Sequence, residues 1–123
     1  MKNLTIHCKD FELTNAIKEY AEDKVSALAK YLSEDGDAVK YNLRLGKTSN
    51  SHNAGKIFYA ELGIAVPHKH YDARIEAEDT YASIDLLKDE MAEIIKNHRD
   101  KLRTVSRHDA QKFKEQTHAV DAE

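Results

Sequence analysis

Apolar and polar residues alternate in four short segments of the chain, which is the pattern of strands that bury one face. These segments span residues 4–8, 39–45, 58–66 and 71–77. Two longer segments, residues 15–32 and 79–105, repeat apolar residues every three or four positions, as amphipathic helices do. Thr14 and Asp79 stand at their starts as predicted N-caps. The predicted element order is therefore β-α-β-β-β-α.

The economical packing of these elements is a four-stranded sheet with both helices on one face, which is an α+β fold. The second helix would be about 40 Å long, at 1.5 Å per residue. A strand of eight to ten residues spans only about 30 Å, so we expect the last helical turns to overhang the sheet. We predict one domain over residues 1–105 and a polar, flexible tail over residues 106–123.

The composition bounds the class of protein. Hydrophobic residues make up 41% and charged residues 33% of 123 residues, which suits one globular domain with one core. No apolar run approaches the roughly 20 residues that a membrane helix needs. The start of the chain lacks a hydrophobic signal segment, so we expect a cytoplasmic protein without membrane partners. The single cysteine, Cys8, agrees with a reducing compartment.

Positive charge gathers near the end of the second helix. The net charge of the whole chain is −3, but residues 96–114 carry +5, which leaves −8 on the remainder. Lys96, Arg99, Arg103 and Arg107 fall within an arc of about 80° on a helix. Such a ridge can follow the phosphates of a nucleic acid, although cations near a helix C-terminus also suit the helix dipole without any ligand.

Other polar residues are weaker candidates. Lys18, Lys24 and Lys30 scatter around the first helix and, taken alone, indicate only a solvated surface. The outward face of the sheet should carry mixed charges and one aromatic residue, Tyr59, whereas sheets that stack bases present two or three aromatics. We therefore expect this sheet face to be solvated.

The sequence gives little support to metal binding or catalysis. His68 and His70 form a His-x-His pair and His7 adjoins Cys8, but no spacing matches a tetrahedral zinc site. The chain also lacks a glycine-rich phosphate loop and a nucleophile motif. We predict no metal, no cofactor, no small-molecule substrate and no enzymatic activity.

Two segments resemble a known family. Residues 78–87 read Glu-Asp-Thr-Tyr-Ala-Ser-Ile-Asp-Leu-Leu and resemble the Glu-Asp-x-Tyr-x-x-Ile-Asp-x-Leu signature of ribosome hibernation-promoting factors, a family that includes the short ribosome-associated inhibitor proteins. Residues 11–20 and 23–32 are similar to the first helix of these proteins. The likeness covers about residues 2–105.

The resemblance implies a fold similar to double-stranded RNA-binding domains and a role in ribosome hibernation. It implies that the protein binds ribosomal RNA of the small ribosomal subunit, in the channel for messenger and transfer RNA, and blocks translation under starvation or stress and in stationary phase. It implies a short family member, without the dimerisation domain of long members, and we expect it to be monomeric off the ribosome.

The resemblance also implies a set of RNA-binding residues on the two helices. The matching positions are Lys18, Lys24, Lys30, Lys96, Arg99 and Lys101, and Arg103 and Arg107 continue the ridge. Glu90 and Glu93 depart from the family pattern, because many members have Lys or Arg in mid-helix two. Two alternatives stay open at this point, namely a protein-interaction module and a general binder of double-stranded RNA, both with this fold.

Overall fold

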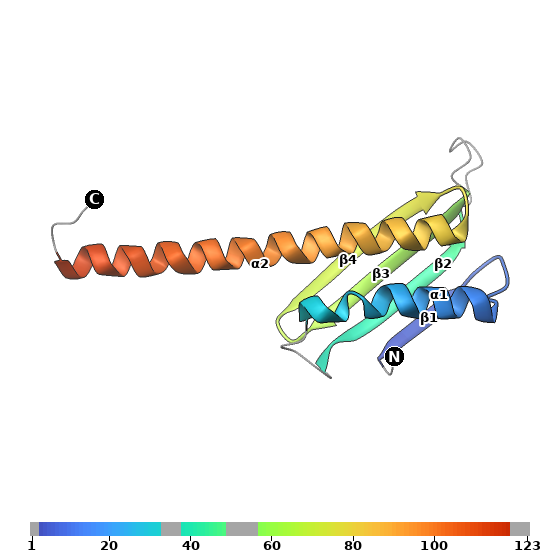
Figure 1. Ribbon diagram of the computed structural model, residues 1–123, viewed down its shortest axis with the longest axis horizontal. Helices are drawn as coiled ribbons and strands as arrows, with labels where there is room; N and C mark the ends of the chain where they lie inside the picture. Colours follow the sequence, from blue (N-terminus) through green and yellow to red (C-terminus); the bar gives the residue numbers. More distant parts are fainter. Residues whose placement is uncertain (1–2, 33–37, 49–56, 119–123) are drawn as a thin grey trace.

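The computed structural model describes residues 3–32, 38–48 and 57–118, with side chains described up to residue 102. Its elements follow the predicted order (Figure 1). The strands are β1 (Leu4–Cys8), β2 (Lys40–Lys47), β3 (Phe58–Val66) and β4 (Lys69–Ala77). The helices are α1 (Asn15–Ser26), the 3-10 helix η1 (Ala29–Leu32) and α2 (Thr80–His118).

The four strands form one mixed sheet in the order β1-β2-β3-β4. β1 lies parallel to β2, with Ile6 opposite Leu43, as the crossover through the first helix requires. The pairs β2–β3 and β3–β4 are antiparallel, as two strands joined by a hairpin must be. β1 and β4 are therefore the two edges of the sheet, and β4 is the longer of them.

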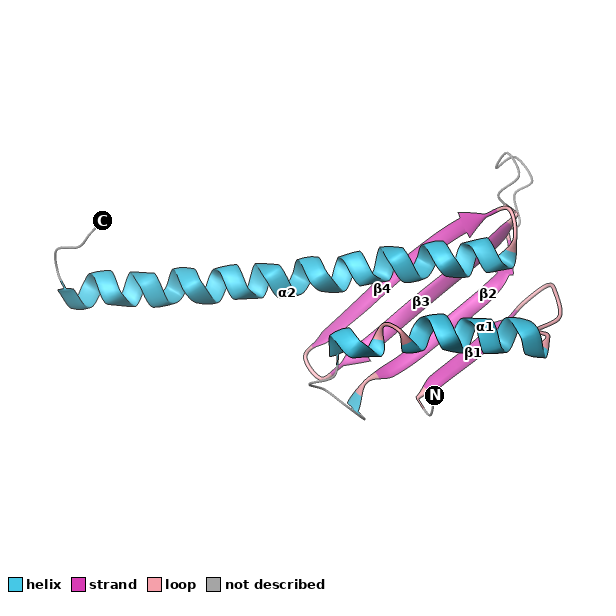
Figure 2. Ribbon diagram, in the orientation of Figure 1, coloured by secondary structure: helices cyan, strands magenta, loops and turns pink. Residues whose placement is uncertain are grey.

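Both helices cover the same face of the sheet, which confirms the predicted α+β architecture (Figure 2). The core lies between these two layers, because every second residue of a strand points toward the helices. The central strands contribute Leu43 and Leu62, and α2 contributes Ile84 and Met91, all of them 2% exposed or less. Burial of this apolar face holds α2 against the sheet.

Side-chain caps fix the starts of both long helices. The backbone N–H of Ile17 donates to Thr14 Oγ1 at 3.2 Å. The backbone N–H of Ala82 donates to Asp79 Oδ1 at 2.8 Å. Each cap satisfies an amide that has no partner within its own helix, and both N-cap predictions are confirmed.

The first helix differs from its prediction as one continuous element over residues 15–32. α1 ends at Ser26, and the chain tightens there into i to i−3 hydrogen bonds. The N–H of Leu28 donates to the carbonyl of Val25 at 2.9 Å, and that of Tyr31 to the carbonyl of Leu28 at 3.0 Å. Leu28 and Leu32 are buried all the same, because the 3-10 turn also directs their side chains toward the core.

The second helix is longer than its apolar stripe predicted. α2 continues to His118, beyond the predicted end at residue 105, and Figure 1 shows it extending far past the sheet. Residues 106–118 contain neither glycine nor proline, so nothing in them breaks a helix. The predicted overhang is confirmed, while the domain boundary at 105 and the flexibility of residues 106–123 stay predictions. None of the described helices combines the length and apolar character that crossing a bilayer requires.

Candidate nucleic-acid interface

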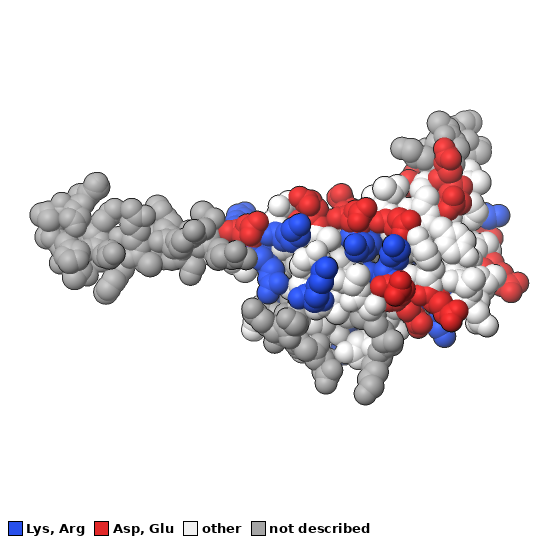
Figure 3. All heavy atoms as spheres, viewed as in Figure 1, with Lys and Arg blue, Asp and Glu red and all other residues white. Residues whose placement is uncertain are grey.

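Basic side chains gather where α1 and η1 lie beside α2. Figure 3 shows them as a band across the helical face, with acidic side chains on both sides of it. We define the basic band by five residues of the described chain that share neighbours across the two helices or one arc of α2, namely Lys24, Lys30, Lys88, Lys96 and Arg99. Two helices are needed to build it, so the fold brings together cations that are far apart in the sequence.

Arg99 joins the two sides of the band. Its Nη1 donates to the backbone carbonyl of Tyr31 in η1, and the side chain is half-buried. Beside it, Tyr71 Oη and His98 Nδ1 lie 2.8 Å apart and connect β4 to α2. The bond to η1 means that Arg99 helps to position the two helices as well as adding charge. A guanidinium that donates to a carbonyl also has fewer N–H donors left for a phosphate.

Replacing Arg99 by glutamine tests this positioning role. The Arg99→Gln variant should lose roughly 1–2 kcal/mol of unfolding free energy, because the carbonyl of Tyr31 loses a charged donor. Urea denaturation measures the loss. Lys96→Gln is the control, since Lys96 is exposed, and it should be as stable as the wild type. Wild-type stability of Arg99→Gln would show that the bond to the Tyr31 carbonyl does not stabilise the packing of the two helices.

Lys24 is partly neutralised inside the protein. Its Nζ lies 3.3 Å from Asp85 Oδ1 on α2, and 5.3 Å from the centre of the Tyr20 ring. The Tyr20 hydroxyl donates to the same Asp85 oxygen at 2.6 Å. This hydrogen bond is the main reason that the pKa of Asp85 is lowered, with Lys24 and Lys88 adding to the effect. The same bond raises the pKa of Tyr20 to about 12.

Removing the Tyr20 hydroxyl should change how stability depends on pH. The folded-state pKa of Asp85 is lowered, so its stabilising contribution is complete above the ordinary carboxyl pKa and is lost as the pH falls through the folded value. In Tyr20→Phe the pKa of Asp85 should rise toward that of an ordinary aspartate. Carboxyl-carbon NMR titration measures this shift. Lys24→Gln is the comparison and should move the pKa less. An unchanged pKa in Tyr20→Phe would contradict the assignment.

The remaining predicted residues divide into two groups. Lys30 and Lys96 are exposed and belong to the basic band, and the Lys30 ammonium lies 5.2 Å from the centre of the Tyr31 ring. Lys18 and Lys101 are also exposed, but no described contact joins them to the band. The side chains of Arg103 and Arg107 lie outside the described residues, so their place in the ridge stays a prediction.

Two cations of this surface were missed from the sequence, Lys88 within the band and Lys69 beside it. Lys88 lies one turn after Asp85 and on the same arc of α2 as Lys96 and Arg99, which helical spacing could have indicated. Lys69, at the start of β4, lines a hollow together with Arg99, His98 and Leu102. No local pattern could place Lys69 there, since only the tertiary fold brings the β3–β4 turn to α2.

The outward sheet face is solvated, as predicted, and its charges are largely paired with one another. Arg44 Nη1 lies 3.3 Å from Glu61 Oε1, and Arg74 Nη2 lies 3.2 Å from Glu76 Oε2. The Arg74 guanidinium also covers the Tyr59 ring, 4.3 Å from its centre. A surface whose cations and aromatic ring already have partners is a poor site for RNA, which leaves the helical face as the candidate interface.

Metal ions have no evident site in the part of the chain that the structure describes. Nowhere in it do three His, Cys, Asp or Glu side chains come together as ligands would. Cys8 faces inward, donates from its Sγ to the carbonyl of Phe11 at 3.2 Å, and has a raised pKa because it is partly buried. It is therefore a small core residue whose thiol favours the protonated form.

The fold and the basic band define a small α+β domain with a cationic helical face. The chain belongs to the family described as sigma 54 modulation protein / S30EA ribosomal protein, whose model matches residues 4–103. This match covers the sheet, α1, η1 and α2 as far as residue 103, and so includes all five residues of the basic band.

Similar proteins agree with this assignment. The ribosome hibernation promotion factor of Staphylococcus aureus is 26% identical over 109 residues, which are 87% of this chain and 53% of that protein. The ribosome hibernation promotion factor of Lactococcus lactis is 26% identical over 105 residues, or 83% and 52% of the two chains. The chain thus spans about half the length of these curated relatives.

Solved structures show the same fold. The N-terminal domain of Thermus thermophilus Protein Y superposes with a TM-score of 0.61 at 28% identity, covering 76% of this chain and 93% of that one. A ribosomal subunit interface protein from Coxiella burnetii superposes with a TM-score of 0.57 at 16% identity, covering 79% and 97%. At that lower identity, the second likeness concerns the fold alone.

Proposed function

We propose that this protein is a ribosome hibernation factor, which binds ribosomal RNA of the small subunit in the mRNA and tRNA channel and blocks translation under stress or starvation. The observation that carries the proposal is the family match over residues 4–103, which includes all five residues of the basic band. The names of the relatives from Staphylococcus aureus and Lactococcus lactis support the hibernation role.

The mechanism is occlusion, with no chemistry on a substrate. The basic band provides closely spaced positive charges that can follow an RNA backbone, because binding releases the counterions condensed on the phosphates. Phosphate contacts of this kind position a protein without reading base sequence. A rigid domain held in the channel excludes messenger and transfer RNA by its volume alone. Such a role places the protein in the cytoplasm, with the small ribosomal subunit as its partner.

Co-sedimentation with purified small ribosomal subunits tests the proposal. We expect binding that weakens steeply between about 50 and 200 mM salt, because phosphate contacts depend on counterion release. Subunits already loaded with messenger and transfer RNA should bind less protein, because the channel is filled. Equal binding to loaded and empty subunits would contradict the channel site.

A competing RNA separates this function from general double-stranded RNA binding. The fold permits both, so an excess of a plain RNA duplex should be added to the complex of protein and small subunits. A hibernation factor should stay on the subunit, since its surface fits one shaped site. Displacement by the duplex at equal phosphate concentration would favour the general binder, and binding insensitive to salt would favour a protein-interaction module.

A further inference from the structure

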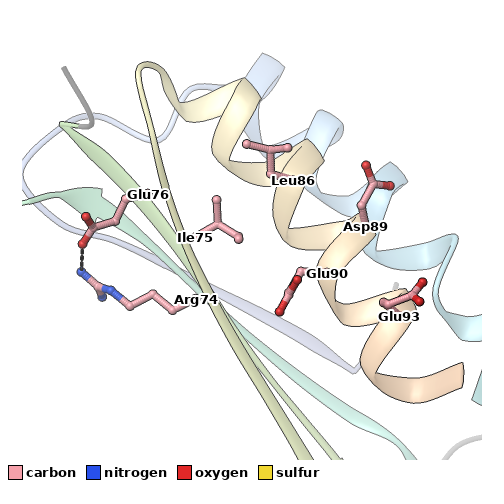
Figure 4. Close-up of a pocket in the computed structure, with 7 residues that line it drawn as sticks. All are labelled: Arg74, Ile75, Glu76, Leu86, Asp89, Glu90 and Glu93. Carbon is pink, nitrogen blue, oxygen red and sulfur yellow. Dashed lines mark hydrogen bonds and ion pairs between the residues drawn. The ribbon is translucent and has the colours of Figure 1, made fainter. Parts of the chain in front are cut away.

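A groove runs between the free edge of the sheet and the flank of α2 that faces away from the basic band. It is about 630 Å³ in volume, and its walls come from β4 and from α2 (Figure 4). The lining residues are Arg74, Ile75, Glu76, Leu86, Asp89, Glu90 and Glu93. On a helical wheel its α2 residues lie roughly 120° from those of the basic band.

The floor of the groove is apolar. Ile75 and Leu86 face the space between the strand and the helix, and Leu86 is 49% exposed. A leucine exposed to this extent beside a half-buried isoleucine offers apolar surface that a partner side chain could cover. A partner could therefore bind the groove through apolar contacts as well as through the attraction between opposite charges.

The rim of the groove is acidic, and its carboxylates are exposed to a binding partner. Glu90 and Glu93 are exposed, and neither forms an ion pair with a described residue. The one cation of the groove, Arg74, is already held by Glu76 at 3.2 Å and by Glu61 at 3.9 Å. The groove therefore has a negative potential, which repels RNA and attracts a basic partner.

The strand wall of the groove can accept another strand. β4 is an edge of the sheet, and it pairs with β3 over nine consecutive residues without a bulge or a proline. The outward N–H and C=O groups of such an edge are a template for a further strand. β1, the other edge, has only five residues.

We propose that this groove binds an extended, basic segment of a partner protein, which adds to β4 as a fifth strand. Its backbone would pair with the edge of β4, one apolar side chain would lie on Ile75 and Leu86, and flanking Lys or Arg side chains would reach Glu90 and Glu93. A second copy of this chain is a poor occupant, because pairing β4 with β4 would bring two acidic rims together.

The proposal goes beyond ribosomal RNA binding and concerns a separate surface. Because the groove and the basic band occupy different flanks of α2, a basic protein segment and an RNA could be bound at the same time. The domain would then be bound through two surfaces, the basic band in contact with RNA and the acidic groove in contact with the basic protein segment. Binding at the groove is measurable on the free protein, so its failure would leave the proposed hibernation function unaffected.

A peptide titration tests the groove. The probe is a synthetic peptide of about nine residues, the length of an ordinary strand, in which Lys and Arg alternate with Val and Ile. Amide NMR shifts should move along β4 and the 86–93 segment of α2. In Glu90→Gln/Glu93→Gln the affinity should fall roughly fivefold, because two exposed ion pairs are lost. Methylating alternate backbone nitrogens of the peptide should abolish binding by blocking strand addition.

The matched control is Glu19→Gln/Glu22→Gln, which removes an acidic pair of the same spacing from α1 and should leave the affinity unchanged. Equal affinity of wild type and Glu90→Gln/Glu93→Gln, or undiminished binding of the methylated peptide, would overturn the proposal. So would shifts confined to β1 or the basic band. Concentration-dependent dimerisation of the free protein that shifts the amides of β4, without peptide binding, would identify a second copy as the occupant instead.

Discussion

Reversing two charges in the basic band, in the variant Lys30→Glu/Lys96→Glu, should lower the affinity for small ribosomal subunits about thirtyfold at 0.1 M salt. Both lysines are exposed and neither forms an ion pair with a described residue, so the loss reflects missing phosphate contacts and not a damaged fold. The slope of log affinity against log salt should flatten by about 1.5, because two fewer counterions are released on binding. Co-sedimentation at several salt concentrations measures both quantities.

The matched control for this variant is Lys18→Glu/Lys101→Glu. It makes the same change of net charge at two exposed lysines that lie outside the basic band. We expect a several-fold weaker effect, carried only by long-range repulsion. If the two variants bind equally weakly, the wider set implied by the family resemblance, and not the band, is the RNA-binding surface. If both bind like the wild type, RNA contacts lie elsewhere on the molecule.

The strands could be predicted closely from the sequence because one physical rule decides them. Side chains alternate between the two faces of a strand, so Leu43 had to face the core if Arg44 faced water. The same rule gave the solvated outer face of the sheet. The N-caps Thr14 and Asp79 were also predictable, since a cap bonds to an amide only three residues away.

The ends of the helices were harder to predict, because apolar periodicity reports burial and not helical geometry. Leu28 and Leu32 are spaced for an α-helix, yet they reach the core through a 3-10 turn. Beyond residue 105 the apolar stripe ends because α2 leaves the sheet, and an overhanging helix has no core to bury a stripe in. The loss of periodicity there marked the end of the packing surface and not the end of the helix.

The candidate site shows what sequence spacing cannot supply. Spacing placed Lys96 and Arg99 on one arc of α2, but the partner of Arg99 is the carbonyl of Tyr31, 68 residues away. Tyr20 and Asp85, which hold Lys24, are likewise 65 residues apart. Cations with such long-range partners, Arg99 and Lys24, help to hold the fold together, whereas the exposed Lys30 and Lys96 are available to RNA. Glu90 and Glu93, which depart from the family pattern of cations in mid-helix two, line the groove beside β4 and lie on a different flank of α2 from the basic band.

The largest expected effect on stability belongs to Leu43, at the centre of the core. Its side chain is 0% exposed, and its strand β2 pairs with β1 on one side and β3 on the other. Leu43→Ala should lower the unfolding free energy by about 3–4 kcal/mol, because the buried methyl groups are lost and a cavity is left. For a domain of this size that corresponds to a melting temperature lower by roughly 10–20 °C.

Leu102→Ala makes the same chemical change at a side chain that is 56% exposed, and it should stay within about 0.5 kcal/mol of the wild type. Urea denaturation of both variants separates stability from compactness, since the midpoint should fall for Leu43→Ala while the slope stays constant. A loss of equal size in both variants would mean that Leu102 is covered in solution. A small loss of unfolding free energy in Leu43→Ala would mean that the helices can move to fill the cavity. Packing against a rigid core would then not explain why α1 and α2 keep the spacing that builds the basic band.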